Sequence, residues 1–236
     1  MVRARSERAY ILALWPWRET SVIAELLTAR HGRVAVTVKG AKRPGGKFRG
    51  LINAFTPLLV NFSGSGEVKN LTDAKWLGGL PAIAPEALVS AFYVNELVMR
   101  LTVREDPCEE LFGAYEDVLG ALASEKGLGL QRALRIFEVK LLRVLGWGQS
   151  AKEEELARDD LFWIVRNGEL KSVDALASGE AGVPADVARA IVSCRFDNAA
   201  DIRGSRDVLR EIIGYYVGDR GLNTRSTMAR WAGFSP

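Results

Sequence analysis

Hydrophobic and polar positions follow the period of a β-strand over much of the first 75 residues. Val34, Val36 and Val38 alternate with Ala35 and Thr37, which is the pattern of a half-buried strand. Short apolar or β-rich runs also cover residues 9–14, 21–28 and 53–62, and another run returns over 67–72 after a turn at 63–66. Five short strands joined by close turns predict a small Greek-key barrel.

The pattern changes to that of helices after a group of glycines and prolines at residues 78–85. Apolar residues recur at helical spacing over 86–104, 111–122 and 130–145, then from Pro184 toward Phe196 and over 208–216. The first of these segments is apolar almost all round, so we expect a helix buried on several sides. Asn167-Gly168, between apolar residues, predicts a β-hairpin insertion at about 161–173.

The charge is distributed unevenly between these two regions. The whole chain has a formal net charge of +3, but residues 1–80 contain 13 lysines and arginines against 5 acids, and residues 81–236 contain 19 against 24. We therefore predict an α+β chain of two domains: a five-stranded barrel over residues 1–80, and a mainly α-helical domain over 81–236 that contains the hairpin. The oligonucleotide-binding (OB) barrel is the commonest small barrel that also has a basic loop.

The most basic part of the chain is the segment Lys39–Arg49, with five cations in eleven residues and no acid. It lies between two predicted strands, so we expect a loop that projects from the barrel toward a polyanion. Phe48 could stack on an unpaired base there. A solvated surface loop without a ligand is the alternative. The candidate nucleic-acid-binding residues are this loop and the cations around it: Arg3, Arg5, Arg18, Arg33, Lys39, Lys42, Arg43, Lys47, Phe48 and Arg49.

Two other groups of side chains are noteworthy. Trp15 and Trp17 fall in a predicted loop, where large rings either pack on the second domain or stack on bases, and we expect one of them to pack. In the helix over 130–145, Arg132, Arg135 and Arg143 lie opposite the apolar stripe. They form either plain solvated surface or a docking site for an acidic peptide tail.

Signatures of catalysis are missing from the sequence. The chain has one histidine, His31, which is next to a turn glycine, and it has no nucleophile elbow, Walker loop or dinucleotide fingerprint. Cys108 and Cys194 are far apart and suggest neither a disulfide framework nor a zinc site. No apolar run is long enough for a membrane span. We expect a cytoplasmic protein that is not an enzyme and uses no cofactor.

Taken in order along the chain, these motifs resemble the bacterial RecO family. The likeness includes His31-Gly32-Arg33 and Lys39–Arg43 in the barrel, and 93–97, 104–107 and 134–138 in the helical region. It continues through Leu145-Gly146-Trp147-Gly148 and a glycine-rich basic stretch at 218–226. The pieces are weak one by one, but their order and spacing together are specific.

The resemblance implies an N-terminal OB domain that binds single- and double-stranded DNA and anneals complementary strands. It also implies a cytoplasmic, nucleoid-associated role with RecR, and often RecF, in loading RecA onto gaps covered by single-stranded DNA-binding protein. The acidic C-terminal tail of that protein would dock on the helical domain, for which Arg132, Arg135 and Arg143 are our candidates.

The chain departs from the family at one motif. Many members carry a four-cysteine zinc motif after the helix that ends near Leu145, whereas residues 149–172 contain no cysteine here, so we expect a zinc-free hairpin.

Two other functions are alternatives to a DNA-binding mediator. One is an RNA-binding OB module, because stacking and backbone contacts would serve RNA equally well. The second alternative is a nuclease, but a metal-dependent nuclease would need clustered carboxylates to hold the metal, and the basic region has few acids.

Overall fold

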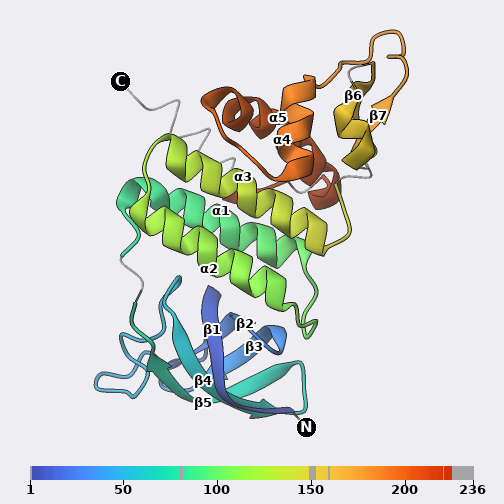
Figure 1. Cartoon of the computed structure of the whole chain (residues 1–236). Coiled ribbons are helices and arrows are strands. Elements are labelled where there is room, and N and C mark those ends of the chain that lie inside the picture. The colour runs from blue at the N-terminus through green and yellow to red at the C-terminus, as the bar shows by residue number, and fades with distance from the viewer. Residues whose placement is uncertain (1, 80–81, 149–152, 159, 220, 225–236) are drawn as a thin grey trace. The chain divides into compact units, whose positions relative to one another are not determined.

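A computed structural model describes residues 2–79, 82–148, 153–158, 160–219 and 221–224. Packing divides the chain into two compact units, Met1–Ala123 and Ser124–Pro236. Figure 1 shows the strands β1 to β5 and the helices α1 and α2 of the first unit, and the helices α3 to α5 and the hairpin β6–β7 of the second. The predicted domain boundary between residues 80 and 81 stays a prediction.

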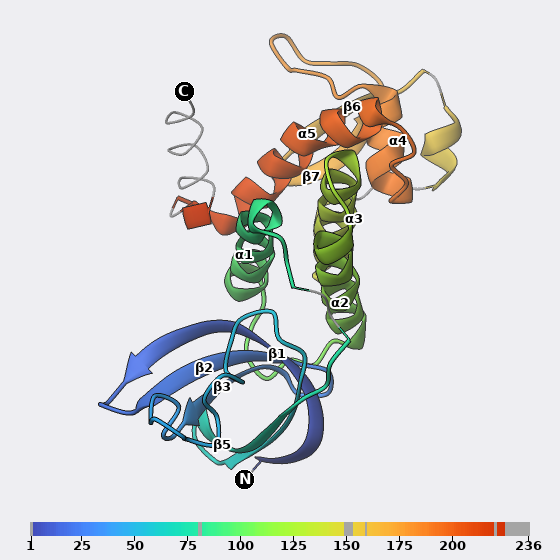
Figure 2. The ribbon, with the colours of Figure 1, turned by 90° about the vertical axis from the view of Figure 1, so that its left-hand side faces the viewer.

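Five strands of the first unit form a closed barrel in the order β1-β2-β3-β5-β4. They are β1 (Val2–Trp17), β2 (Ser21–Thr28), β3 (Gly32–Val38), β4 (Leu58–Gly64) and β5 (Val68–Trp76). All neighbours are antiparallel except β3 and β5, and the pairing of β1 with β4 closes the ring, which Figure 2 shows nearly end-on. The predicted five-stranded OB barrel is confirmed.

Alternation of side chains along the strands separates the interior of the barrel from its outer face. Val34, Val36 and Val38 of β3 are buried in the core with Leu58, Val60 and Phe62 of β4. A bulge between Ile11 and Ala13 in β1 shifts the register with β2, which lets the long strand bend around the ring. Beyond Ala9, β1 pairs with β2 and no longer with β4, so its final residues extend as a two-stranded hairpin.

Two helices of the same unit pack on the outer face of the barrel. Helix α1 (Pro85–Leu101) begins with a proline, and α2 (Glu109–Ser124) with two acids that favour the positive end of the helix dipole. Buried Asn95 of α1 donates to the carbonyl of Leu12 in β1 and accepts from the hydroxyl of Tyr115 in α2. One polar side chain therefore joins a strand and both helices. Helix α1 is buried on several sides, as expected, but the apolar residues Leu88 and Phe92 are exposed.

A buried carboxylate joins the barrel to the end of α1. Glu25 of β2 is fully buried, and its two oxygens accept from the guanidinium of Arg104 at 2.9 and 2.7 Å. Arg33 of β3 lies 3.4 Å from the same carboxylate and donates to the carbonyls of Met99 and Thr102. These bonds satisfy carbonyl groups at the C-terminal end of the helix that have no partner within it.

The second unit consists of helices around a small hairpin. Helix α3 (Leu128–Val144) packs on α5 (Ala199–Val217), which packs on α4 (Ala185–Ser193), and η1 (Glu153–Ala157) is a 3-10 turn. The strands β6 (Phe162–Arg166) and β7 (Glu169–Val173) pair across Asn167-Gly168, both at positive φ, as the tightest hairpin turns require. The predicted hairpin and the mainly helical C-terminal region are confirmed.

We predict that Gly32→Ala strongly destabilises the first unit. Gly32 has φ +64, and a Cβ there would lie 2.2 Å from the carbonyl oxygen of Asp106. Left-handed strain costs about 1–2 kcal/mol and the steric clash about 1–3 kcal/mol more, so we expect a loss of roughly 3 kcal/mol or more in the free energy of unfolding. Urea denaturation followed by circular dichroism measures it.

Gly45→Ala is the matched control, because Gly45 has φ +73 but nothing within 4 Å of its added Cβ. We expect it to lose only the strain energy of about 1–2 kcal/mol. Equal losses in the two variants would contradict the close approach of Gly32 to the segment after α1.

Candidate nucleic-acid interface

The basic loop after β3 is a chain of tight turns anchored at two points. Backbone N–H groups of Arg43, Gly46 and Arg49 each donate to the carbonyl three residues earlier. The N–H of Lys42 donates to the carbonyl of Thr20, 3.0 Å away, in the turn between β1 and β2. The loop is therefore fixed against the tip of the β1–β2 hairpin, and Figure 2 shows this hairpin running out to one side of the ring.

Phe48 is the second anchor of the loop, and the expectation that its ring stacks on a base is corrected here. The residue is 7% exposed and belongs to the barrel core, with Ala41 and Ile52 packed against the same cluster. An aromatic residue flanked by cations suggested an exposed platform, but burial of the ring is what holds this loop on the barrel. No ring face remains available for a ligand.

Four loop cations remain accessible around these anchors. Lys39, Lys42, Arg43 and Arg49 are exposed, and none forms an ion pair with another residue that the structure describes. Lys47 is exposed too, but its ammonium lies 2.9 Å from the carboxylate of Asp73 in β5 and donates to the carbonyl of Thr72. That hydrogen bond lowers the pKa of Asp73 from its ordinary value. Lys47 therefore neutralises an acid of the barrel and contributes less positive charge to a ligand.

The structure divides the remaining predicted cations into three groups. Arg18 is exposed in the hairpin turn beside Thr20, to which the loop is bonded. Arg3 and Arg5 are exposed at the opposite end of β1, so the predicted residues do not form one continuous patch. Arg33 is engaged within the unit by Glu25 and α1, and burial lowers its pKa. Its guanidinium is therefore already engaged in this arrangement, and its prediction as a DNA-binding residue stays untested.

Two tryptophans lie beside the accessible cations. Trp15 and Trp17 were expected in a loop, with one of them packed. They instead form the end of β1, paired with Ile23 and Ser21 of β2, and they are 41% and 45% exposed. The short loop Arg18–Thr20 allows the strands to pair up to Trp17. In the sequence, this extension could have been found by asking whether residues 15–17 can pair with residues 21–23.

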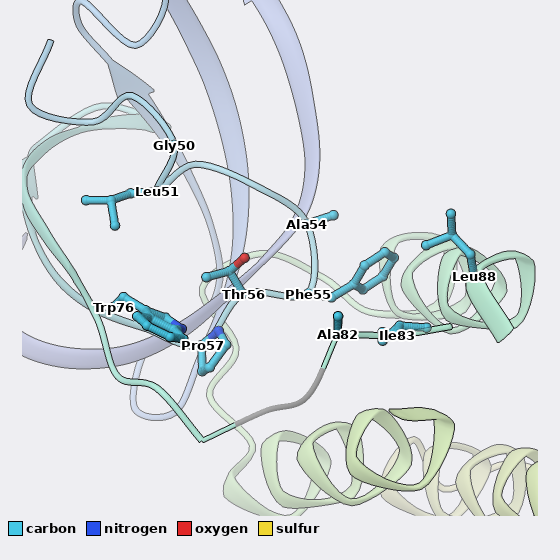
Figure 3. Close-up of a pocket in the computed structure, with 10 residues that line it drawn as sticks. All are labelled: Gly50, Leu51, Ala54, Phe55, Thr56, Pro57, Trp76, Ala82, Ile83 and Leu88. Atoms are coloured by element: carbon cyan, nitrogen blue, oxygen red, sulfur yellow. The ribbon is translucent and has the colours of Figure 1, made fainter. Parts of the chain in front are cut away.

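The first unit also has an apolar pocket of ≈ 550 Å³ between the end of β5, the segment before β4 and the start of α1. Figure 3 shows Trp76 beside Pro57, and Phe55 directed toward Leu88. The lining is Gly50, Leu51, Ala54, Phe55, Thr56, Pro57, Trp76, Ala82, Ile83 and Leu88. None of these side chains is ionisable, so the side chains that line this pocket offer no general acid or base.

In the second unit, the predicted stripe of arginines on α3 is only partly a surface. Arg135 is 8% exposed, and its guanidinium donates to the carboxylate of Glu138, which is also buried. Arg143 donates to the carbonyl of Val192 in α4, and Arg132 lies 3.9 Å from Asp197. Helical spacing places Arg132, Arg135 and Arg143 opposite the main apolar stripe of α3. It does not show that the side of the helix with Arg135 is buried. Arg135 is therefore buried and does not contribute to the candidate surface.

The described residues contain no group of three or more His, Cys, Asp or Glu side chains placed to hold a metal ion. None of the helices described has the length and apolar character required to cross a bilayer. What the first unit offers instead is a cluster of accessible cations (Arg18, Lys39, Lys42, Arg43 and Arg49, hereafter the cationic cluster), with two exposed indoles alongside. Such a surface can bind a polyanion through charge and stacking.

The fold thus defines a class of protein: an OB barrel with a basic loop, followed by helices and a small hairpin. The family model described as recombination protein O, N-terminal, matches residues 1–80, and its C-terminal counterpart matches residues 84–225. The chain belongs to the RecO family of DNA repair and recombination proteins.

Similar proteins from several bacteria agree with this assignment. A DNA repair protein RecO from Aromatoleum aromaticum is 37% identical over 236 residues, covering 96% of this chain and 95% of that one. Another from Methylococcus capsulatus is 37% identical over 232 residues, covering 94% and 92%. A third from Thiobacillus denitrificans is 33% identical over 249 residues, covering 99% and 95%. The similarity extends over both the barrel and the helical region.

We predict that Phe48 stabilises the barrel and does not contact DNA. Phe48→Ala should lower the free energy of unfolding by about 3–5 kcal/mol, because it removes a large buried ring. Phe48→Leu should cost less and remain folded at 20 °C. Its affinity for a single-stranded oligonucleotide, measured by fluorescence anisotropy, should stay within about twofold of the parent. A tenfold loss in folded Phe48→Leu would show that the ring does contact bases.

Proposed function

We propose that this chain is a non-enzymatic DNA-binding mediator of recombination in the RecFOR pathway. It binds single- and double-stranded DNA, anneals complementary strands and helps load RecA onto single strands coated with single-stranded DNA-binding protein. The observation that carries the proposal is the cationic cluster, in which five exposed cations around one loop and one hairpin turn have no acidic partner among the described residues. Membership of the RecO family supports the same role.

The barrel, proposed as the DNA-binding domain over residues 1–80, acts through charge neutralisation. Each phosphate paired with a lysine or arginine releases condensed counterions, which favours binding to any sequence. Two strands held on such a surface repel each other less and can pair. Lysine and arginine side chains on the surface adapt to either a single strand or a duplex, which fits a protein that must bind both the reactants and the product of annealing.

The helical region is proposed as the site for protein partners. The partners are RecR, in some pathways RecF, and the acidic C-terminal tail of single-stranded DNA-binding protein. Of the three arginines first considered, Arg132 and Arg143 have guanidinium groups at the surface, and these are our candidates for the tail carboxylates. Docking of the tail would bring the basic barrel to a strand that is already coated.

We predict that the quadruple variant Lys39→Ala, Lys42→Ala, Arg43→Ala and Arg49→Ala binds single- and double-stranded DNA more weakly, by about tenfold to a hundredfold at 100 mM salt. The slope of log affinity against log salt should fall by about 0.7 for each phosphate of a single strand that the variant no longer neutralises. Annealing of complementary oligonucleotides should slow in parallel. Anisotropy titrations at several salt concentrations and a quenched-pair annealing assay measure both effects.

A matched control removes four exposed arginines from the second unit: Arg158, Arg195, Arg203 and Arg206. The net charge changes equally, so a similar loss in this control would mean that total charge, and not the cationic cluster, determines binding. An RNA oligonucleotide of the same sequence is included, and a clear preference for RNA would favour an RNA-binding role. Unchanged affinity in the loop variant would refute the proposed interface.

We predict that Arg132→Ala combined with Arg143→Ala weakens binding of a labelled peptide with the sequence of the cognate tail by about tenfold, because two charge-assisted contacts are removed. Arg203→Ala on α5 is the single-charge control and should have no effect. Binding of the tail peptide that is unchanged in the double variant would place the docking surface elsewhere.

A further inference from the structure

The end of β1 presents two indole rings to solvent on one face of the sheet. Trp15 and Trp17 are separated by two positions, so their side chains leave the strand on the same side. They are about half as exposed as free side chains, at 41% and 45%. Large aromatic residues normally contribute to a core, and the barrel core is already filled without these two rings.

The spacing of these rings is suited to nucleobases. Residues i and i+2 of a strand are about 6.7 Å apart, which is roughly twice the 3.4 Å rise between successive nucleotides of one strand. Two indoles at this separation can accept one base between their faces or support successive bases of an extended strand. A sheet that carries aromatic residues at its surface is a known solution to binding unpaired bases.

Cations of the cationic cluster lie at the same hairpin turn as the two rings. Arg18 directly follows Trp17, and the N–H of Lys42 is bonded to Thr20 at the same hairpin turn. Lys39 follows Val38, which pairs with Val22 of β2, so Lys39 comes next to Ser21, the register partner of Trp17. Glu19 is the one acid in this turn. Rings and phosphate-binding groups therefore lie on one surface, as binding of single strands requires.

We propose that Trp15 and Trp17 form a stacking platform for unpaired bases, while Arg18, Lys39 and Lys42 hold the phosphates of the same strand. The inference rests on the proposed DNA-binding function and adds a preference to it. Bases within a duplex are stacked on each other and do not offer their faces, so the platform acts on single strands only. Stacking occupies the faces of the bases and leaves their pairing edges free for a complementary strand.

The test compares three variants with the parent protein, using a 20-nucleotide oligo(dT) and a duplex of the same length at several salt concentrations. The double variant Trp15→Leu and Trp17→Leu removes the rings and keeps apolar bulk. The double variant Trp15→Phe and Trp17→Phe keeps aromatic faces, and the quadruple loop variant removes charge. Thermal unfolding checks that each is folded, and the single substitutions Trp15→Leu and Trp17→Leu replace the double variant if it is not.

The leucine variant should lose about tenfold or more in affinity for oligo(dT), since stacking is a major contribution per base. Its duplex affinity should stay within about twofold, and its salt slope should be unchanged, because every phosphate-binding cation is still present. The phenylalanine variant should retain most of the single-strand affinity. Oligo(dT) should quench the tryptophan emission of the parent, and most of this quenching should disappear in the phenylalanine variant.

Two results would overturn the platform: oligo(dT) affinity that is unchanged in the leucine variant, or equal losses on single strands and duplex. If the loop variant weakens both polymers at the same time, the proposed function stands and only the platform fails. If the parent binds neither polymer, or the loop variant binds as well as the parent, the proposed interface fails, and the platform fails with it.

Discussion

The buried carboxylate of Glu25 is the constraint that organises the first unit. A carboxylate without water is unstable unless it is paired and fully hydrogen-bonded, and Arg104 supplies both bonds while Arg33 adds a second positive charge. Arg33 at the same time bonds the last carbonyls of α1. The hydrogen bonding of Arg104 to Glu25 raises the pKa of Arg104, whereas burial lowers that of Arg33. The outer face of β2 and β3 is thereby closed by the end of α1 and the segment after it.

This closure determines which cations remain for a ligand. Several cations of the first unit are paired with acids of the same unit: Arg33 and Arg104 with buried Glu25, Arg30 with buried Glu7, and buried Lys69 with exposed Glu105. At the hairpin turn and in the β3–β4 loop, Lys47 is paired with Asp73, and the other cations form no ion pair with a residue that the structure describes. A formal count of basic residues therefore overstates the charge available to a polyanion, and the cationic cluster lies where the two loops meet.

The sequence allowed the fold to be predicted well and the site only in part. Period-two alternation in β3 and the Asn167-Gly168 turn are local signals, and both elements form as expected. The errors concern exposure, which depends on contacts distant in the sequence. Arg33 is covered by carbonyls more than sixty residues away, and Phe48 turns into a core formed by strands on either side of it. The exposure of Arg135 depends on the packing around α3, which no local period shows.

The proposed role in annealing would require the barrel to hold strands firmly and yet leave their pairing edges free. The loop backbone is fixed by the bond from Lys42 to Thr20 and by the burial of Phe48, so the proposed binding of DNA would cost little backbone entropy. The lysine and arginine side chains stay mobile in solvent and follow either a single strand or a duplex. Charge alone would hold both polymers without distinction. Two exposed rings next to that charge would favour the unpaired strand, because they can stack on its bases. When a complementary strand pairs, the base faces become buried in the duplex and the rings lose these contacts.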